Sequence, residues 1–150
     1  MSLNRNGLPV QILLVEDSAG DVSLTREALR EARVANDLHV VGDGVLAMAY
    51  LRGIAPYEGR LRPELVLLDL NLPRMDGREV LQEMKSDEAL RNIPVVVLTT
   101  SSADTDISHS YQLHANAFVT KPVAFRDFLE AIRLLEGFWL EIVRLPGQDD

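Results

Sequence analysis

The stretch LVLLDLNLPRMDG, residues 65–77, decides the fold class. It opens with four aliphatic residues that lead into Asp69, and such a short unbroken apolar run is typical of a strand buried on both faces. The Asn, Pro and Gly residues that follow indicate a loop. Asp76 then precedes an amphipathic stretch over residues 77–84. The segment therefore predicts a buried strand, a loop and a helix in that order.

Similar apolar runs recur along the chain, each short and bounded by polar or turn residues. We predict strands at residues 11–15, 38–41, 65–68, 95–98 and 117–119, and helices near 22–32, 45–51, 76–84, 104–114 and 125–143. This alternation predicts an α/β fold with a doubly wound, five-stranded parallel sheet. The expected strand order is the flavodoxin-like 2-1-3-4-5. Two Pro and two Gly in residues 53–63 predict an enlarged loop before the third strand.

The composition fits one domain and excludes several kinds of site. The chain has 150 residues, no cysteine and a net charge of −8, which excludes disulfides and thiol nucleophiles and disfavours nucleic acid and anionic membranes as partners. No apolar run approaches a membrane span or a signal peptide, so we expect a cytoplasmic protein. We expect a flexible leader at 1–8, a single domain at 9–145 with an extended last helix, and a flexible acidic tail at 146–150.

Polar residues follow four of the predicted strands and should meet at one edge of the sheet. Glu16 and Asp17 follow the first strand, Asp69 the third, Thr99 the fourth and Lys121 the fifth. Three adjacent carboxylates repel one another unless a cation offsets their charge, and Mg²⁺ prefers such oxygen ligands. With the Lys121 ammonium as a second positive charge, the pocket suits a transient phosphoryl group on a carboxylate.

Four segments of the chain together resemble the signature segments of response-regulator receiver domains, the phosphoacceptor modules of two-component signalling. These segments are VEDS, LLDLNLPRMDG, VVVLTTS and FVTKP, in the order and spacing of that family. The resemblance covers roughly residues 9–136. It implies a stand-alone switch that accepts phosphate from a sensor histidine kinase and signals through a changed protein-interaction surface.

The resemblance assigns a role to each acidic residue. It implies that Asp69 receives the phosphoryl group and also binds Mg²⁺. Asp17 is expected to bind the metal directly, and Glu16 through a water molecule. Asn71, two residues after Asp69, is expected to offer its backbone carbonyl to the metal.

The resemblance also implies a conformational switch. Thr99 is expected to move toward the phosphoryl group, and Phe118 to follow as the switch aromatic. Lys121 is expected to neutralise the phosphoryl charge, and its bond to Pro122 to be cis. Thr100 is a second candidate for the switch threonine. We choose Thr99 because Lys121 lies 22 residues after it, which is the usual family distance.

Features outside the four segments narrow the family type. The enlarged loop, the segment VGDGVLAMAYLRG and the apolar last helix look like small regulators paired with phytochrome-type histidine kinases. Large apolar residues after Leu134 exceed what one buried helix stripe needs, and such excess often marks an interface. We therefore expect a homodimer through the last helix, with no nucleic acid or membrane partner.

The same residues allow other interpretations. A pseudo-receiver would keep the fold as a docking module without phosphorylation. An aspartate-nucleophile phosphatase would need a second Asp where Asn71 stands, and EDSAGD lacks the glycine pattern of a dinucleotide site. We therefore expect a signalling protein and not an enzyme, catalysing only its own phosphoryl transfer and autodephosphorylation. We expect His39, His109 and His114 to be structural or surface residues.

Overall fold

Five short apolar segments form one parallel sheet in the order β2-β1-β3-β4-β5. The computed structural model describes residues 9–33, 35–99, 115, 117–121 and 123–133. Its strands are β1 (Val10–Val15), β2 (Asn36–Val41), β3 (Leu65–Asp69), β4 (Val95–Thr99) and β5 (Ala117–Thr120). The predicted strands and their order are confirmed, each strand being one or two residues longer than its apolar run.

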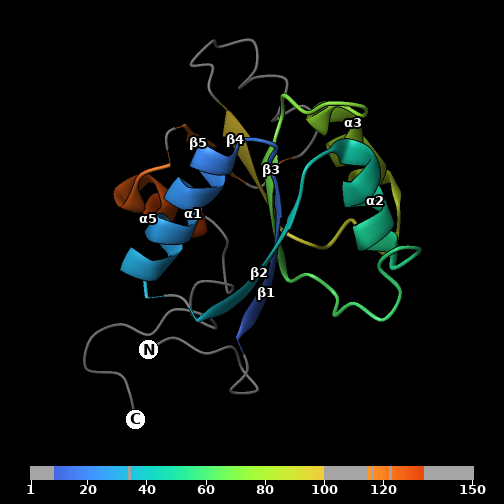
Figure 1. Ribbon diagram of the computed structural model, residues 1–150, viewed down its shortest axis with the longest axis horizontal. Coiled ribbons are helices and arrows are strands. Elements are labelled where there is room, and N and C mark those ends of the chain that lie inside the picture. Colours follow the sequence, from blue (N-terminus) through green and yellow to red (C-terminus); the bar gives the residue numbers. More distant parts are fainter. Residues whose placement is uncertain (1–8, 34, 100–114, 116, 122, 134–150) are drawn as a thin grey trace.

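The described helices cover the two faces of the sheet in pairs. They are α1 (Ala19–Glu31), α2 (Gly44–Arg52), α3 (Gly77–Ser86) and α5 (Phe125–Arg133). Helices α1 and α5 lie on one face, and α2 and α3 on the other (Figure 1). Because both faces are covered, β1 and β3 are buried along their whole length, as their unbroken apolar runs predict.

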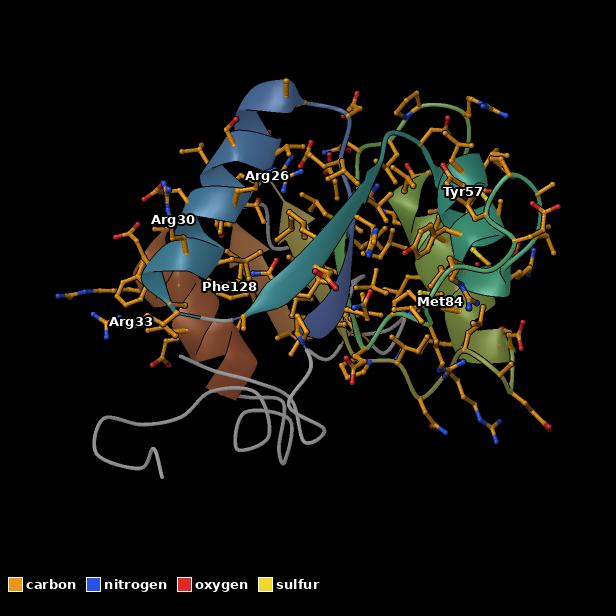
Figure 2. All side chains as sticks on the ribbon, turned by 60° about the horizontal axis from the view of Figure 1, so that its bottom comes forward. Arg26, Arg30, Arg33, Tyr57, Met84 and Phe128 are labelled. Atoms are coloured by element: carbon orange, nitrogen blue, oxygen red, sulfur yellow. The ribbon has the colours of Figure 1, made fainter. Side chains whose placement is uncertain are left out.

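Each face of the sheet carries its own apolar cluster. Phe128 is buried between the sheet and the α1/α5 layer, and Met84 is buried in the α2/α3 layer. Tyr57 packs against the second cluster from the loop after α2. Figure 2 shows Phe128 on one side of the sheet and Met84 and Tyr57 on the other. The two clusters hold the strands in fixed register, which fixes the positions of the residues that follow them.

Polar residues begin the first three helices at the edge of the sheet where the strands end. Ser18 caps α1, Asp43 caps α2 and Asp76 caps α3, each by accepting a hydrogen bond from a backbone N–H of its own helix. Glu79 completes a capping box with Asp76. These caps fix where each helix starts relative to the strand before it.

The predicted enlarged loop between α2 and β3 is confirmed. Gly53 ends α2 in the left-handed conformation with a φ of 66°, and turns follow it rather than a helix. The Ala55–Pro56 peptide bond in this loop is cis. Arg60 closes the loop onto α2 by donating hydrogen bonds to the carbonyl oxygens of Tyr50 and Leu51, both at 2.7 Å.

Several expectations fall on residues outside the described ranges. They are the leader at 1–8, the helix at 104–114, the cis bond to Pro122, the last helix beyond Arg133 and the tail at 146–150. Within the described ranges, no helix is both long and apolar enough to cross a membrane.

Candidate functional site

Three carboxylates meet at the edge of the sheet where β1 and β3 end. Glu16 and Asp17 directly follow β1, and Asp69 is the last residue of β3. The two strands pair in parallel with Val15 opposite Leu68, so their ends lie at the same level. Carboxylate oxygens of the three residues lie within 4.8 Å of one another, as the sequence predicts.

The ammonium of Lys121 lies beside this cluster. Its Nζ atom is 2.6 Å from Glu16 Oε1 and 3.2 Å from Asp69 Oδ2, and its side chain is 5% exposed. Burial alone would lower the pKa of Lys121, but its ion pairs with Glu16 and Asp21 and the charge of Asp69 raise that pKa well above its usual value. Lys121 is therefore a fixed positive charge in the pocket at neutral pH.

Glu16 is a buried carboxylate that holds the end of β1. Its side chain is fully buried, and Oε2 accepts a hydrogen bond from the backbone N–H of Ser18 at 3.2 Å. Oε1 has the Lys121 ammonium close by but no donor aligned for a hydrogen bond within the described residues. Burial raises the pKa of Glu16, and although the nearby Lys121 ammonium opposes this shift, the pKa stays above its usual value.

The donor set of this pocket fits a hard divalent cation. Three carboxylates with oxygens in reach of one point are the ligands that such ions prefer. Asp17 is exposed and Asp69 is buried, so an ion would be bound at the mouth of the pocket rather than inside the core. A cation there would also offset the mutual repulsion of the carboxylates.

The loop after β3 is packed tightly around Asp69. The backbone N–H of Asn71 donates a hydrogen bond to Asp69 Oδ1 at 3.1 Å. A Cβ atom at Gly77 would lie 2.2 Å from the carbonyl oxygen of Asp69, so only glycine fits this position. The backbone of Arg74 is in the left-handed region with a φ of 67°. Its guanidinium pairs with Asp43 Oδ2 at 3.1 Å and links this loop to the cap of α2.

The expected switch residues lie on the two strands beyond β3. Thr99 is the last residue of β4 and stands opposite Thr120 of β5, and its side chain is outside the described part. Phe118 of β5 is partly buried against the α2/α3 apolar cluster. Asn71 is exposed at the pocket mouth. Thr100, Pro122, His109 and His114 are outside the described ranges.

One residue of the pocket is missing from the sequence-based prediction. Asp21, in the first turn of α1, accepts a hydrogen bond from Lys121 Nζ at 3.0 Å through Oδ2. Its position three residues after the Ser18 cap places it in the first helical turn, near the strand end. That spacing in EDSAGD is the signal that could have indicated it.

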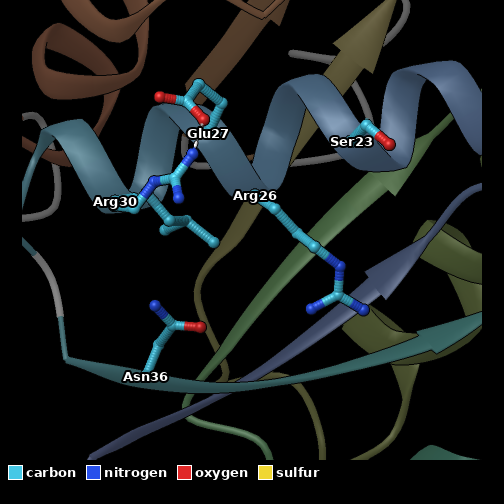
Figure 3. A pocket seen from close by; sticks show the side chains of 6 residues that line it. Ser23, Arg26, Glu27, Arg30 and Asn36 are labelled. Atoms are coloured by element: carbon cyan, nitrogen blue, oxygen red, sulfur yellow. Dashed lines mark hydrogen bonds and ion pairs between the residues drawn. The ribbon is translucent and has the colours of Figure 1, made fainter.

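Two other groups of polar residues lie away from this pocket. A cavity beside α1 and the start of β2 is lined by Ser23, Arg26, Glu27, Arg30 and Asn36 (Figure 3). It contains none of the residues that the sequence predicts for the site. His39 of β2 contacts the Gln11 side chain at 3.1 Å and the ring of Tyr50, in keeping with a structural role.

The chain is similar to known response regulators. Residues 12–133 match the response regulator receiver domain family. The response regulator Rcp1 of Synechocystis sp. is 48% identical over 139 residues, which cover 93% of this chain and 95% of that protein. The alignment thus spans nearly all of both proteins.

Solved structures of response regulators are also similar to this chain over nearly its whole length. The Mn²⁺-bound form of Rcp1 has a TM-score of 0.75 at 47% identity, covering 93% of this chain and 100% of that one. The bacteriophytochrome response regulator RtBRR has a TM-score of 0.82 at 42% identity, covering 94% and 86%. The phosphorylated cyanobacterial phytochrome response regulator RcpA has a TM-score of 0.75 at 47% identity, covering 93% and 99%.

Proposed function

We propose, since this chain belongs to the response regulator receiver domain family, that it is a phosphorylation switch in which Asp69 accepts a phosphoryl group from a sensor histidine kinase. The observation that carries this proposal is the position of Asp69 Oδ2, 3.2 Å from the buried Lys121 ammonium and within a cluster of three carboxylates. The phosphorylated form of the similar protein RcpA supports it.

The proposed reaction is transfer of a phosphoryl group between two nucleophiles. An Asp69 carboxylate oxygen attacks phosphorus, the P–N bond of phosphohistidine breaks, and its electron pair leaves on the imidazole nitrogen, which takes up a proton. Water later hydrolyses the acyl phosphate and returns the carboxylate and inorganic phosphate. Lys121 would stabilise the charge that develops on the phosphoryl oxygens.

We propose Mg²⁺ as the metal that the pocket holds. Asp17 and Asp69 would bind it directly, Asn71 through its backbone carbonyl and Glu16 through a water molecule. The Mn²⁺-bound form of Rcp1 supports a divalent ion in such a pocket. When bound, the ion supplies positive charge to the phosphoryl oxygens.

We propose that phosphorylation changes the protein-interaction surface by moving Thr99 and Phe118. Thr99, at the end of β4, would move toward the phosphoryl group, and Phe118 in the adjacent β5 would follow into the space that it leaves. Such a change transmits a signal only if a partner binds the two forms with different affinity. The kinase partner is proposed to be of the phytochrome type, because RtBRR and RcpA are phytochrome response regulators. We place the reaction in the cytoplasm.

The test is the intact mass of the protein after incubation with acetyl phosphate, with and without Mg²⁺. We expect a magnesium-dependent phosphoryl adduct on the wild type and none on Asp69→Asn, which keeps the size of the side chain. Asp37→Asn, on the exposed start of β2, is the matched control and should be phosphorylated like the wild type. No adduct on the wild type, even after rapid quenching, would favour the pseudo-receiver instead.

We also propose that the chain forms a homodimer through its last helix. The test is the molar mass by light scattering at micromolar concentration, before and after phosphorylation. A dimer in at least one state supports the proposal, and a monomer in both states contradicts it. Replacing Trp139 by Ser in the predicted interface should lower the dimer fraction, whereas Leu61→Ser in the exposed loop should not.

A further inference from the structure

The Lys121 ammonium already has as many carboxylate neighbours as it has N–H bonds. Its Nζ atom lies 2.6 Å from Glu16 Oε1, 3.0 Å from Asp21 Oδ2 and 3.2 Å from Asp69 Oδ2. A lysine ammonium offers three donors and no acceptor, and this one is almost fully buried. A phosphoryl oxygen that approaches Nζ therefore competes with these carboxylates for the ammonium.

Among the three carboxylates, Asp21 is the one that can release the ammonium most easily. The Glu16 side chain is completely buried, and a buried charge that loses its partner is strongly unfavourable. Asp69 carries the phosphoryl group itself. The Asp21 side chain is 26% exposed, so water can solvate its carboxylate once the ion pair is broken. The exchange at Nζ should therefore take place at Asp21.

We propose that Asp21 is a positioning residue that holds Lys121 in the unphosphorylated pocket and competes with the phosphoryl group for the ammonium. This inference rests on the proposed function, because it concerns the same phosphorylation step. Asp21 does not belong to the cluster of three carboxylates whose oxygens lie within 4.8 Å of one another. Its charge opposes both the anionic phosphodonor and the phosphorylated product.

The backbone around Asp21 keeps its carboxylate at the pocket. The Ser18 side chain accepts a hydrogen bond from the Asp21 N–H at 3.3 Å, and the Thr25 hydroxyl donates one to the Asp21 carbonyl oxygen at 2.9 Å. Asp21 thus links the first turn of α1 to Lys121, 100 residues later in the sequence. Release of Lys121 on phosphorylation would remove this link between α1 and the end of β5.

A purely structural role for Asp21 makes a different prediction. An acidic residue in the first turn of a helix stabilises the helix through its dipole, independently of Lys121. If that were its whole function, Asp21→Asn would lower the stability of the protein and leave the phosphorylation rate unchanged. The rate therefore distinguishes the two roles.

The experiment measures the rate of phosphorylation by acetyl phosphate at saturating Mg²⁺, with urea unfolding as the check on folding. We expect Asp21→Asn to be phosphorylated roughly threefold to tenfold faster, because one negative charge near the phosphoryl group is gone while Glu16 and Asp69 still hold Lys121. The increase should be smaller with phosphoramidate, a less anionic donor. Asp21→Glu should restore the wild-type rate to within about twofold, since it keeps the charge.

The matched control is Glu31→Gln, which removes the same charge from the exposed end of α1. It should be phosphorylated at the wild-type rate. If Asp21→Asn does not fold, Asp21→Ser serves as the second neutral variant. A rate for the neutral variant equal to that of the control, or lower, would overturn the inference alone. A wild type that takes up no phosphoryl group would overturn the proposed function together with the inference.

Discussion

The two loops that flank β3 are each held by an arginine, yet they differ in how tightly they are packed. Arg74, in the loop after β3, pairs with Asp43 across to the neighbouring loop. Arg60, in the loop before β3, donates two hydrogen bonds to the last carbonyls of α2. The first loop surrounds the candidate site, whereas the second lies at the opposite end of the strand.

Packing separates the two loops more clearly than their hydrogen bonds do. A Cβ atom at Gly44 would lie 2.0 Å from the carbonyl oxygen of Met75, and one at Gly77 would lie 2.2 Å from that of Asp69, so there is no room for a methyl group where either glycine meets the loop after β3. In the loop before β3, a Cβ at Gly59 would meet nothing within 4 Å, and Ile54 and Leu61 are exposed. The loop after β3 thus holds Asp69 and Asn71 closely at the candidate site, whereas the loop before β3 leaves space around its residues.

Adding a methyl group against the loop after β3 should have the largest effect on stability and on phosphorylation. In Gly77→Ala the new methyl group overlaps the carbonyl oxygen of Asp69, so either the loop moves or the helix start does. We expect the free energy of unfolding to fall by about 3 kcal/mol, and phosphorylation by acetyl phosphate to slow by more than about tenfold. Urea unfolding and intact mass measure the two effects.

The control for this change is Gly42→Ala, at the same end of the sheet. A Cβ atom at Gly42 meets nothing within 4 Å. We expect its unfolding free energy to stay within about 0.5 kcal/mol of the wild type. If both variants behaved alike, close packing around Asp69 would not be what holds the site.

Breaking the arginine contact of each loop should give effects of different kinds. Arg60→Ala removes two hydrogen bonds from a charged donor, so we expect a loss of about 1–2 kcal/mol in unfolding free energy. The phosphorylation rate should stay within about twofold of the wild type, because the loop is far from the pocket. A slower rate in a folded Arg60→Ala protein would show that the loop before β3 also supports the site.

The corresponding change for the loop after β3 is Asp43→Asn, which lies on the neighbouring loop and removes the ion-pair partner of Arg74. Asparagine can still cap α2 through its side-chain oxygen, but it loses the ion pair with Arg74. Since the Arg74 side chain is largely exposed, we expect only about a threefold weaker affinity for Mg²⁺, measured by titration calorimetry. Arg52→Gln, which breaks a similar surface pair with Glu83, should leave that affinity unchanged.

The smallest expected effect is on the pH dependence of unfolding and concerns Tyr50. Its ring packs against that of Tyr57 in the loop before β3, with 5.1 Å between ring centres. Burial raises the pKa of Tyr50 above its usual value of 10.0. The unfolded chain then loses this proton first, so the stabilisation is complete below pH 10 and is lost as the pH rises through the raised pKa. Tyr50→Phe should unfold with a weaker pH dependence above pH 10, and an unchanged profile would contradict this.

The fold could be predicted from the sequence because its strands are unbroken apolar runs. The runs at 65–68 and 95–98 are each buried completely, and the alternation with amphipathic stretches leaves few sheet topologies. The start of β2 could not be predicted, because its Asn36 and Asp37 lie at the edge of the sheet, where polar residues are tolerated. Its pairing with β1, and not its hydrophobicity, extends that strand.

The centre of the site could be predicted for a related reason. Residues that follow adjacent parallel strands must meet, which brings Glu16, Asp17 and Asp69 together and puts Lys121 beside them. Asp21 could not be placed in the same way, because its contact depends on the direction in which the first turn of α1 points its side chain. The ion pair of Arg74 could not be predicted either, because its partner Asp43 lies on another loop.

The most direct test of the central claim is to locate the phosphoryl group after incubation with acetyl phosphate and Mg²⁺. Borohydride reduces an acyl phosphate to an alcohol, so a phosphorylated aspartate becomes homoserine and can be found by peptide mass mapping. The tight packing around Asp69 predicts homoserine at position 69 and at no other acidic residue. Homoserine at position 17 or 21 instead would contradict the claim that the loop after β3 positions the phosphoacceptor.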